Sequence, residues 1–343
     1  MYNPHLYNSP YHRIGLSPYK FLVTGGAGFI GSNLVEYLLK YNAGHVRVLD
    51  NLSNGYLENI KAFLSLPNFE FIEGDIRNLE TCKRAVEGID FISHQAALGS
   101  VPRSIKEPIM TNEVNISGFL NILSAAKESS SCKQMVYAAS SSTYGDSKAL
   151  PKIEGQEGKP LSPYAVTKMV NEYYAGVFSQ VYGFHTIGLR YFNVFGPKQN
   201  PNNPYAAVIP IFCRHFLEGT TPTINGDGET TRDFTFVENA VQANIRAMLY
   251  NITHPENRIT RHEVFNTACG HQISLNRMVQ ILQQLTGKSL NCNYGPERIG
   301  DVKHSKASIK KIVEQLNYQP KQDFEVGLEL ALNWYKNKAV TER

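Results

Sequence analysis

The segment FLVTGGAGFIGSNLVEYLL, residues 21–39, restricts the possible folds of this chain more than any other stretch. Gly25, Gly28 and Gly31 stand at GxxGxxG spacing between a short apolar run and a helical pattern of apolar residues. Without side chains at these positions, the backbone and the positive end of the following helix can approach a pyrophosphate closely. A glycine pattern alone is weak evidence for nucleotide binding. Between a predicted strand and a predicted helix, however, it is typical of a dinucleotide-binding unit.

Short apolar runs alternate with helical patterns over the first half of the chain. The predicted strands are residues 21–24, 45–50, 69–74, 90–95, 134–139 and 185–191. Helical patterns begin near Gly28, Gly55, Asn78, Pro108 and Pro163. Strands and helices that take turns predict an α/β fold, with a Rossmann-type doubly wound parallel sheet that helices cover on both faces.

The pattern changes after the last of these strands, where loops rich in Gly, Pro and Asn begin. We predict an N-terminal extension at residues 1–19, a dinucleotide-binding Rossmann domain at residues 20–192, and a smaller C-terminal α/β substrate lobe at residues 193–343. Apolar patterns within residues 236–270 indicate that the chain returns to the first domain there.

The acid that ends the second predicted strand indicates which dinucleotide is bound. Asp50 lies where a carboxylate accepts hydrogen bonds from an adenosine ribose. It would repel a 2′-phosphate, and the following NLSNG offers no Arg or Lys to bind one. NAD is therefore the predicted cofactor rather than NADP. Its predicted contacts are Gly25, Gly28, Phe29, Ile30, Gly31, Asp50, Asn51, Ser53, Gly55, Asp75, Ile76, Gln95, Ala97, Tyr164 and Lys168.

A tyrosine and a lysine in SPYAVTKMVNE supply a candidate base. Tyr164 and Lys168 are four residues apart on a predicted helix, and therefore on one face of it. An ammonium group near a phenol stabilises the phenolate, as would the positive nicotinamide ring, so the tyrosine pKa can fall far enough for base catalysis. YxxxK is common by chance, and it gains specificity here from the glycine motif and from the hydroxyls of AASSSTYGD, residues 138–146.

Together these motifs resemble the extended short-chain dehydrogenases/reductases and, within them, the UDP-sugar 4-epimerases. The resemblance covers nearly the whole chain and is carried by TGGAGFIGS, DIRN, HQAALGSVPRS, SSSTYGD, SPYAVTK, RYFNVFGP, NGDGETTRDF and GDVKHS. Two of them, HQAALGSVPRS and AASSSTYGD, are similar to a bacterial subgroup that prefers N-acetylated UDP-hexoses. The resemblance implies NAD-dependent epimerisation at C4, with UDP-GlcNAc and UDP-GalNAc interconverted through a transient 4-keto sugar and hydride return. It implies catalysis by Ser140, Tyr164 and Lys168, and leaves open whether Ser141 or Ser142 takes the role of Ser140.

The resemblance also implies a UDP-sugar site. Its residues are Gly99, Ser100, Ser140, Ser141, Ser142, Tyr164, Asn193, Ala207, Val208, Ile224, Asn225, Arg232, Arg298, Asp301 and Ser305. Guanidinium groups suit diphosphate oxygens and a carboxylate suits ribose hydroxyls, which fits Arg232, Arg298 and Asp301. In the resembling family a bulky tyrosine at the position of Ser305 excludes an acetamido group, so the small serine implies room for one.

The segment AASSSTYGD, residues 138–146, begins at the end of a predicted strand and carries hydroxyl groups but no acid before Asp146. Resembling dehydratases and decarboxylases have Asp or Glu in this segment, typically as TDEVYG or TSEVYG, so epimerisation is favoured. Three alternatives stay open: a nucleotide-sugar dehydratase or reductase, a 4-epimerase of UDP-Glc/UDP-Gal or of uronic acids, and an NAD-binding sensor without turnover.

Composition limits the partners. The formal net charge is +4, with Lys and Arg interspersed among acids, which indicates no nucleic-acid partner. The five scattered cysteines lack metal-ligand spacing and no apolar run is long enough to span a bilayer, so we predict no metal site, no membrane association and a cytoplasmic location. Apolar residues in excess in the helices around 108–129 and 162–182, together with the resemblance, predict a homodimer joined by a four-helix bundle.

Overall fold

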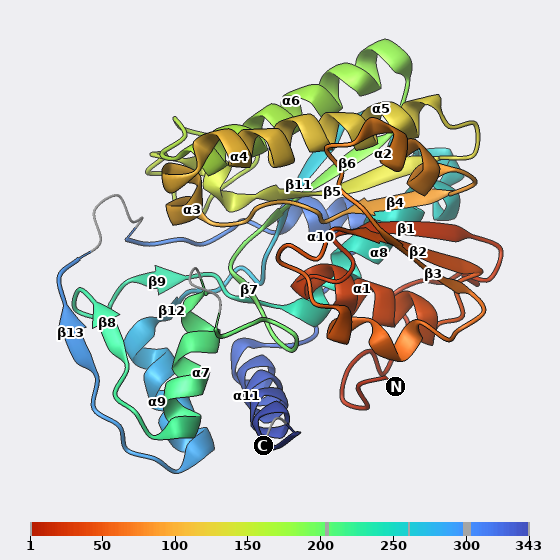
Figure 1. The fold of residues 1–343 in the computed structure, drawn as a ribbon. Coiled ribbons are helices and arrows are strands. Elements are labelled where there is room, and N and C mark those ends of the chain that lie inside the picture. Colours follow the sequence, from red (N-terminus) through yellow and green to blue (C-terminus); the bar gives the residue numbers. More distant parts are fainter. Residues whose placement is uncertain (1, 203–205, 260, 298–302, 342–343) are drawn as a thin grey trace.

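A parallel sheet of seven strands forms the centre of the larger domain in the computed structural model, which describes residues 2–202, 206–259, 261–297 and 303–341 (Figure 1). The strands follow the order β11-β6-β5-β4-β1-β2-β3, and all the pairings are parallel. Their bounds are β1 Lys20–Thr24, β2 His45–Asp50, β3 Phe69–Glu73, β4 Phe91–His94, β5 Gln134–Ser140, β6 Thr186–Tyr191 and β11 Glu263–Thr267. The predicted α/β fold with a Rossmann-type doubly wound sheet is confirmed.

Helices cover both faces of this sheet, which explains why its strands are apolar runs rather than alternating ones. One face carries α2, α5 and α6, and the other carries α1 and α8 (Figure 1). Their bounds are α1 Phe29–Lys40, α2 Leu79–Val86, α5 Phe119–Glu128, α6 Pro163–Tyr182 and α8 Val237–Thr253. The short helices α3 Val101–Lys106 and α4 Pro108–Asn112 lead into α5 through a π-helical segment at Glu113–Gly118.

Local sequence signals set both ends of α6, the helix with the candidate base. Ser162 precedes the helix, and its hydroxyl accepts a hydrogen bond from the backbone N–H of Ala165 at 3.2 Å. Pro163 occupies the first turn, where its missing N–H costs nothing. Gly183 ends the helix at φ +68°, a left-handed conformation that favours glycine. The capped first turn fixes the position of Tyr164 relative to the sheet.

The smaller lobe lies beyond the carboxyl edge of the sheet (Figure 1). It contains α7 Val208–Glu218, α9 Leu275–Thr286, β8 Thr223–Asn225, β9 Thr231–Arg232, β12 Ile273–Ser274 and β13 Asn293–Gly295. The pairs β8–β13 and β9–β12 link parts of the lobe that are distant in sequence. Between the two parts lie β7 Val194–Phe195, β10 Thr235–Phe236, α10 Lys310–Leu316 and α11 Phe324–Thr341.

The prediction of a helix that begins near Gly55 is wrong. The chain forms two short 3-10 turns there, Leu57–Asn59 and Lys61–Phe63. The backbone N–H of Tyr56 and the side chain of Asn59 both donate to the Ala27 carbonyl, at 3.0 and 2.8 Å. These bonds tie the segment to the glycine loop instead of letting it continue as a helix.

Residues 2–19 pack across α1 and α8. Tyr7 and Tyr11 are buried; the Tyr7 hydroxyl donates to Asn33 Oδ1 at 2.9 Å and its backbone N–H donates to Glu238 Oε1 at 3.0 Å. The Tyr11 hydroxyl donates to the same Glu238 carboxylate. The segment thus supplies hydrogen-bond donors to a buried acid of α8. No helix within the described ranges is both long enough and apolar enough to cross a membrane.

Candidate active site

A cavity of about 1060 Å³ opens at the carboxyl edge of the sheet. The strand order reverses between β1 and β4, and ligands of doubly wound sheets bind at such a reversal. Every residue predicted to contact the cofactor lines this cavity. It is also lined by the predicted substrate residues Gly99, Ser100, Ser140, Ser141, Tyr164, Asn193 and Ala207.

The glycine loop leaves no room for side chains. A Cβ atom on Gly31 would lie 2.2 Å from the Gly25 carbonyl oxygen, and one on Gly25 would lie 2.7 Å from the Ala96 nitrogen. Gly25 also has φ +67°. No side chain among the described residues caps the start of α1, and its first turn carries no acid. The free N–H groups and the helix dipole at this end therefore suit a pyrophosphate.

Asp50 is fixed at the end of β2, beside the loop. Its Oδ2 accepts from the Ala27 N–H at 3.0 Å and its Oδ1 accepts from the Leu52 N–H at 2.8 Å. Burial raises the pKa of Asp50, while backbone hydrogen bonds from Leu52, Ala27 and Gly28 oppose the rise. A Cβ on Gly55 would lie 2.9 Å from the carboxylate, so that glycine leaves Asp50 reachable from the cavity.

The fold brings Ser140, Tyr164 and Lys168 together from β5 and α6. Lys168 is buried, and its Nζ donates to the Ala138 carbonyl at 2.8 Å and lies 5.9 Å from the centre of the Tyr164 ring. Burial lowers the pKa of Lys168 to about 8, and Glu172 opposes the fall. The Ser142 hydroxyl donates to Ser140 Oγ at 2.9 Å and does not line the cavity. Ser142 thus supports Ser140 in this structure, while Ser140 and Ser141 reach the cavity.

The protein residues alone keep the Tyr164 phenol protonated. Burial raises its pKa, and a hydrogen bond with Ser140 opposes the rise. The lowered pKa that the sequence predicts includes the charge of the nicotinamide ring, which the protein residues do not supply. Removal from water disfavours the phenolate more than these neighbours favour it. A base at this position therefore needs the further positive charge of an oxidised nicotinamide ring.

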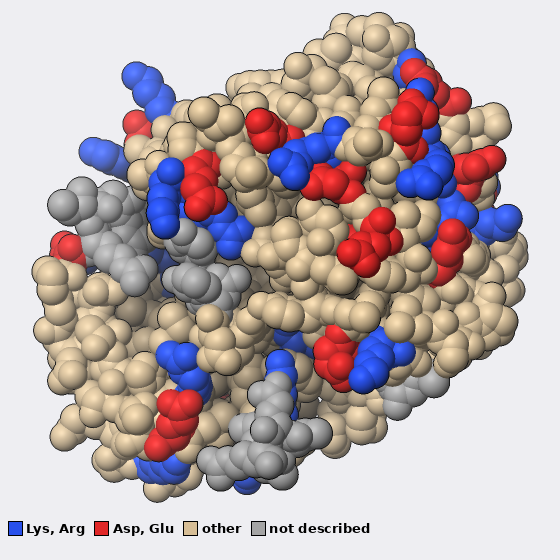
Figure 2. All heavy atoms as spheres, viewed as in Figure 1, with Lys and Arg blue, Asp and Glu red and all other residues tan. Residues whose placement is uncertain are grey.

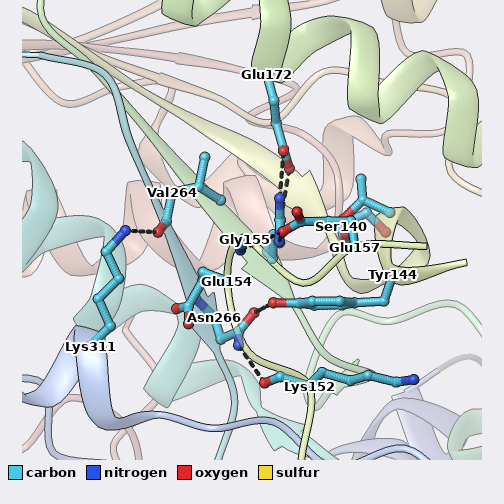
Figure 3. A network of polar contacts seen from close by, with 12 residues as sticks. Ser140, Tyr144, Lys152, Glu154, Gly155, Glu157, Glu172, Val264, Asn266 and Lys311 are labelled. Atoms are coloured by element: carbon cyan, nitrogen blue, oxygen red, sulfur yellow. Dashed lines mark hydrogen bonds and ion pairs between the residues drawn. The ribbon is translucent and has the colours of Figure 1, made fainter. Parts of the chain in front are cut away.

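A buried polar network lies beside Ser140 (Figure 3). Arg190 on β6, with a side chain only 5% exposed, donates to both oxygens of Glu172 at 2.9 and 2.7 Å. It also forms an ion pair with Glu157. Glu172 lies one turn after Lys168 on α6, so this pair holds the helix against the sheet at that point.

The same network holds the loop that follows Ser140. The Tyr144 hydroxyl donates to Asn266 Oδ1 at 2.7 Å, and Asn266 Nδ2 donates to the Lys152 carbonyl at 3.0 Å (Figure 3). The Asn266 N–H donates to Glu154 Oε1 at 2.7 Å. Because Asn266 belongs to β11, the loop is fixed to the edge strand of the sheet.

A second cavity of about 330 Å³ continues into the smaller lobe and shares Asn193 and Ala207 with the first. Among the predicted substrate residues it is lined by Asn193, Ala207, Val208, Ile224, Asn225 and Arg232. Ser305 is half-buried and lines neither cavity, although its N–H donates to the Thr231 carbonyl at 3.2 Å, next to Arg232. Arg298 and Asp301 lie outside the described residues.

Two residues that the sequence reading missed also line the larger cavity. Tyr191 ends β6 beside Ser140; its hydroxyl donates to Gln95 Oε1 at 3.1 Å and accepts from Asn244 Nδ2 at 2.7 Å. Lys198 forms an ion pair with Glu36 of α1 at 2.7 Å. The RYFN motif pointed toward Tyr191, whereas no local pattern pairs Lys198 with an acid so far away in sequence. Within the described ranges, no group of His, Cys, Asp and Glu is arranged to hold a metal.

Comparisons with known proteins agree with this geometry. Residues 21–265 match the model of the NAD dependent epimerase/dehydratase family. The UDP-glucose 4-epimerase of Mycolicibacterium smegmatis is 33% identical over 319 residues, which is 93% of this chain and 99% of the relative.

Two solved structures are similar over almost their whole length. The UDP-N-acetylglucosamine 4-epimerase of Methanobrevibacter ruminantium M1, in complex with UDP-N-acetylmuramic acid, is 36% identical at a TM-score of 0.86, and the match covers 93% of this chain and 99% of that one. The UDP-glucose 4-epimerase of Thermus thermophilus, in complex with NAD, is 30% identical at a TM-score of 0.80 and covers 92% and 99%. The glycine cradle, the placement of Asp50 and these matches agree: the chain belongs to the NAD dependent epimerase/dehydratase family, and NAD is its cofactor.

Proposed function

We propose that this protein is an NAD-dependent 4-epimerase of UDP-hexoses that interconverts UDP-GlcNAc and UDP-GalNAc. The observation that carries the choice of epimerase is the position of the acids. Among the described residues that line the larger cavity, the only carboxylates are Asp50 and Asp75, which end or follow β2 and β3 on the adenosine side. Asp146 does not line it; its Oδ1 accepts from the Lys159 N–H at 2.7 Å. Elimination of water after oxidation draws on an acid near the sugar, and epimerisation does not.

The proposed chemistry uses the residues at the reaction end of the cavity. Bound NAD supplies the hydride acceptor and a positive ring. Tyr164 takes the proton of the sugar 4-hydroxyl, Ser140 hydrogen-bonds the same oxygen, and the Lys168 ammonium stabilises the phenolate. The second cavity holds the nucleotide through Ile224, Asn225 and Arg232. A firmly held nucleotide lets the 4-keto sugar turn over and present its other face.

The test is product analysis after incubation with UDP-GlcNAc, UDP-Glc and UDP-glucuronic acid, without added NAD. We expect the 4-epimers as products, UDP-GalNAc most rapidly, and we expect NAD to stay bound through turnover because the hydride returns. Loss of water from the sugar or net NADH accumulation would identify a dehydratase or reductase instead. Bound NAD without any turnover would identify a sensor.

Ser305 provides a prediction about substrate choice. We expect Ser305→Tyr to lower kcat/KM for UDP-GlcNAc and UDP-GalNAc by about 10- to 100-fold, because the larger ring would occupy the space of the acetamido group. Ser305 itself lines neither cavity, so the effect depends on the longer tyrosine side chain reaching the hexose from this position. UDP-Glc and UDP-Gal should be affected by less than about threefold. Ser289→Tyr, on an exposed loop of the same lobe, is the control. Equal losses on both pairs of substrates would show that position 305 does not border the hexose.

We further propose a homodimer joined through α6 and the helices beside it. Tyr173, Val177 and Val181 on α6 are 65, 52 and 65% exposed, and Ile109 on α4 is 75% exposed. The edge of the molecule over α6 is mostly free of charged residues in the view of Figure 2. An exposed face of this composition is typical of an interface between subunits.

Val177→Asp is expected to convert the dimer to a monomer in light scattering at micromolar concentration, because it would bury a charge in the proposed interface. Val326→Asp, a comparable change at a half-exposed position of α11, should leave the mass unchanged. A wild-type protein that is monomeric at this concentration would contradict the proposal.

A further inference from the structure

Asp233 is a buried acid that lies between β9 and β10, in the stretch that leads from the smaller lobe into α8. Its side chain is fully buried, and its partners among the described residues are backbone N–H groups. Oδ1 accepts from Cys269 at 3.0 Å, and Oδ2 accepts from Gly270 at 3.0 Å and from Ala307 at 3.1 Å. One carboxylate thus joins the turn after β11 to the segment at residues 303–308.

The segment at residues 303–308 is held from two sides. On one side it pairs with β9, where the Thr231 N–H donates to the Lys303 carbonyl at 3.1 Å. On the other side it pairs with Lys152 of the loop after Ser140, whose N–H donates to the Lys306 carbonyl at 2.7 Å. The Ala307 N–H donates to the Asp233 carboxylate rather than to β9 or to the loop that contains Lys152. Asp233 therefore fixes the segment at the point where the two pairings meet.

The backbone of Asp233 acts on the cavities as well. Asn193, which lines both cavities, donates from Nδ2 to the Asp233 carbonyl at 3.1 Å. Asn193 has φ +38°, in the left-handed region, and this bond holds its side chain from outside its own segment. Arg232, the residue before Asp233, lines the nucleotide cavity. Three pieces of the proposed substrate site, Asn193, Arg232 and the segment that contains Ser305, thus depend on this one position.

We infer that Asp233 is a positioning residue for the UDP-sugar: through backbone contacts it sets where Asn193, Arg232 and the segment at residues 303–308 stand around the bound nucleotide sugar. The inference rests on the proposed function for the identity of the ligand. Asp233 touches neither cavity, so it acts through these neighbours. Its carboxylate accepts from Cys269, Gly270 and Ala307 and from no residue of the glycine loop among the described residues, so we expect NAD binding to be largely independent of it.

Asp233→Asn tests this inference. Asparagine offers one acceptor oxygen in place of two, and its amide N–H would meet a backbone N–H, so one of the three bonds is lost. We expect KM for UDP-GlcNAc to rise by about 10- to 100-fold, with kcat and bound NAD per subunit nearly unchanged. Asp227→Asn, an exposed acid of the same lobe, is the matched control.

Two results would overturn the inference. Unchanged KM would show that the contacts do not position the substrate. Parallel loss of kcat, bound NAD and thermal stability would show that Asp233 stabilises the whole fold instead. Wild-type turnover of UDP-GlcNAc tests the proposed function separately, since only the ratio between the variant and wild type reports on Asp233.

The pH dependence of KM provides a second measurement, which uses the wild-type protein and therefore does not depend on whether a variant folds. Burial raises the pKa of Asp233 to about 6, with the three backbone bonds and His271 opposing the rise. Below that pH the carboxyl gains a proton and loses acceptor capacity, so KM for UDP-GlcNAc should rise as the pH falls through about 6. The diphosphate of a UDP-sugar has no proton to gain in this range. A flat KM between about pH 5 and 7 would overturn the inference.

Other titratable groups must be separated from Asp233 in this profile. Those on the elements packed against it are Lys152, Arg232, Cys269, His271, Lys303, His304, Lys306 and Tyr318. Burial raises the pKa of Cys269 to about 12 and also raises that of Tyr318, so both stay neutral. The two histidines of this set are replaced together as a control. A His271→Gln/His304→Gln double variant should keep the rise in KM, and loss of the rise would assign it to the histidines.

Discussion

Replacing Tyr164 by phenylalanine should lower kcat for UDP-sugar epimerisation by about 10²- to 10⁴-fold, the usual contribution of a positioned general base. The phenyl ring keeps the packing of the first turn of α6, so bound NAD and the melting temperature should stay close to wild type. What is lost is the oxygen that exchanges a proton with the 4-hydroxyl. Ser140 cannot replace it, because an unassisted serine hydroxyl is a much weaker base than a phenolate.

The neighbours of Tyr164 make this prediction more specific. Lys168 donates to the Ala138 carbonyl and is held one turn away from the Arg190–Glu172 pair. Lys168→Ala should therefore reduce both the rate and NAD binding, whereas Tyr164→Phe should reduce only the rate. Tyr250→Phe on α8, outside both cavities, is the control for removal of a phenol. Near-normal kcat in Tyr164→Phe, measured with NAD fully bound, would rule out the proposed base.

The sequence signals that point to the cofactor cavity are local. Gly25, Gly28 and Gly31 lie within one strand–turn–helix unit, and Asp50 ends the next strand. The alternation of strands and helices then predicts a parallel sheet, in which the loops after these strands meet at one edge. The helix predicted near Gly55 is absent because Tyr56 and Asn59 bond to Ala27, which lies far away in sequence and is not part of the local pattern.

The substrate side is less predictable because contacts between distant segments assemble it. The Asp233 carboxylate joins residues 269–270 to residue 307, and the Asn193 side chain donates a hydrogen bond to the Asp233 carbonyl. Nothing in the RDF motif itself indicates that its aspartate points away from the cavities. Likewise, the pKa of Tyr164 depends on how deeply the fold buries the phenol, which spacing along a helix does not show.

The glycine loop carries the second large effect. Gly31→Ala should yield a protein without bound NAD and destabilise the fold by about 1–3 kcal/mol or more, the cost of overpacking. The added Cβ would lie 2.2 Å from the Gly25 oxygen and 2.8 Å from its carbon, both backbone atoms. A flexible side chain could move away from such a contact, and a backbone turn held at both ends cannot.

The loop has no freedom to relax because each side of Gly25 is already fixed. Its N–H donates to the Leu49 carbonyl at 2.8 Å, its oxygen accepts from Gly28 at 3.0 Å, and a shift toward β4 meets Ala96. Any displacement that accommodates the methyl group therefore moves the N-terminus of α1, where we expect the pyrophosphate to bind. Gly15→Ala is the control, since its Cβ would meet no atom within 4 Å. NAD content measured by absorbance after denaturation, together with thermal melting, distinguishes the two variants. A Gly31→Ala protein with a full complement of NAD and an unchanged melting temperature would mean that the loop can yield, and that close backbone approach is not what holds the cofactor.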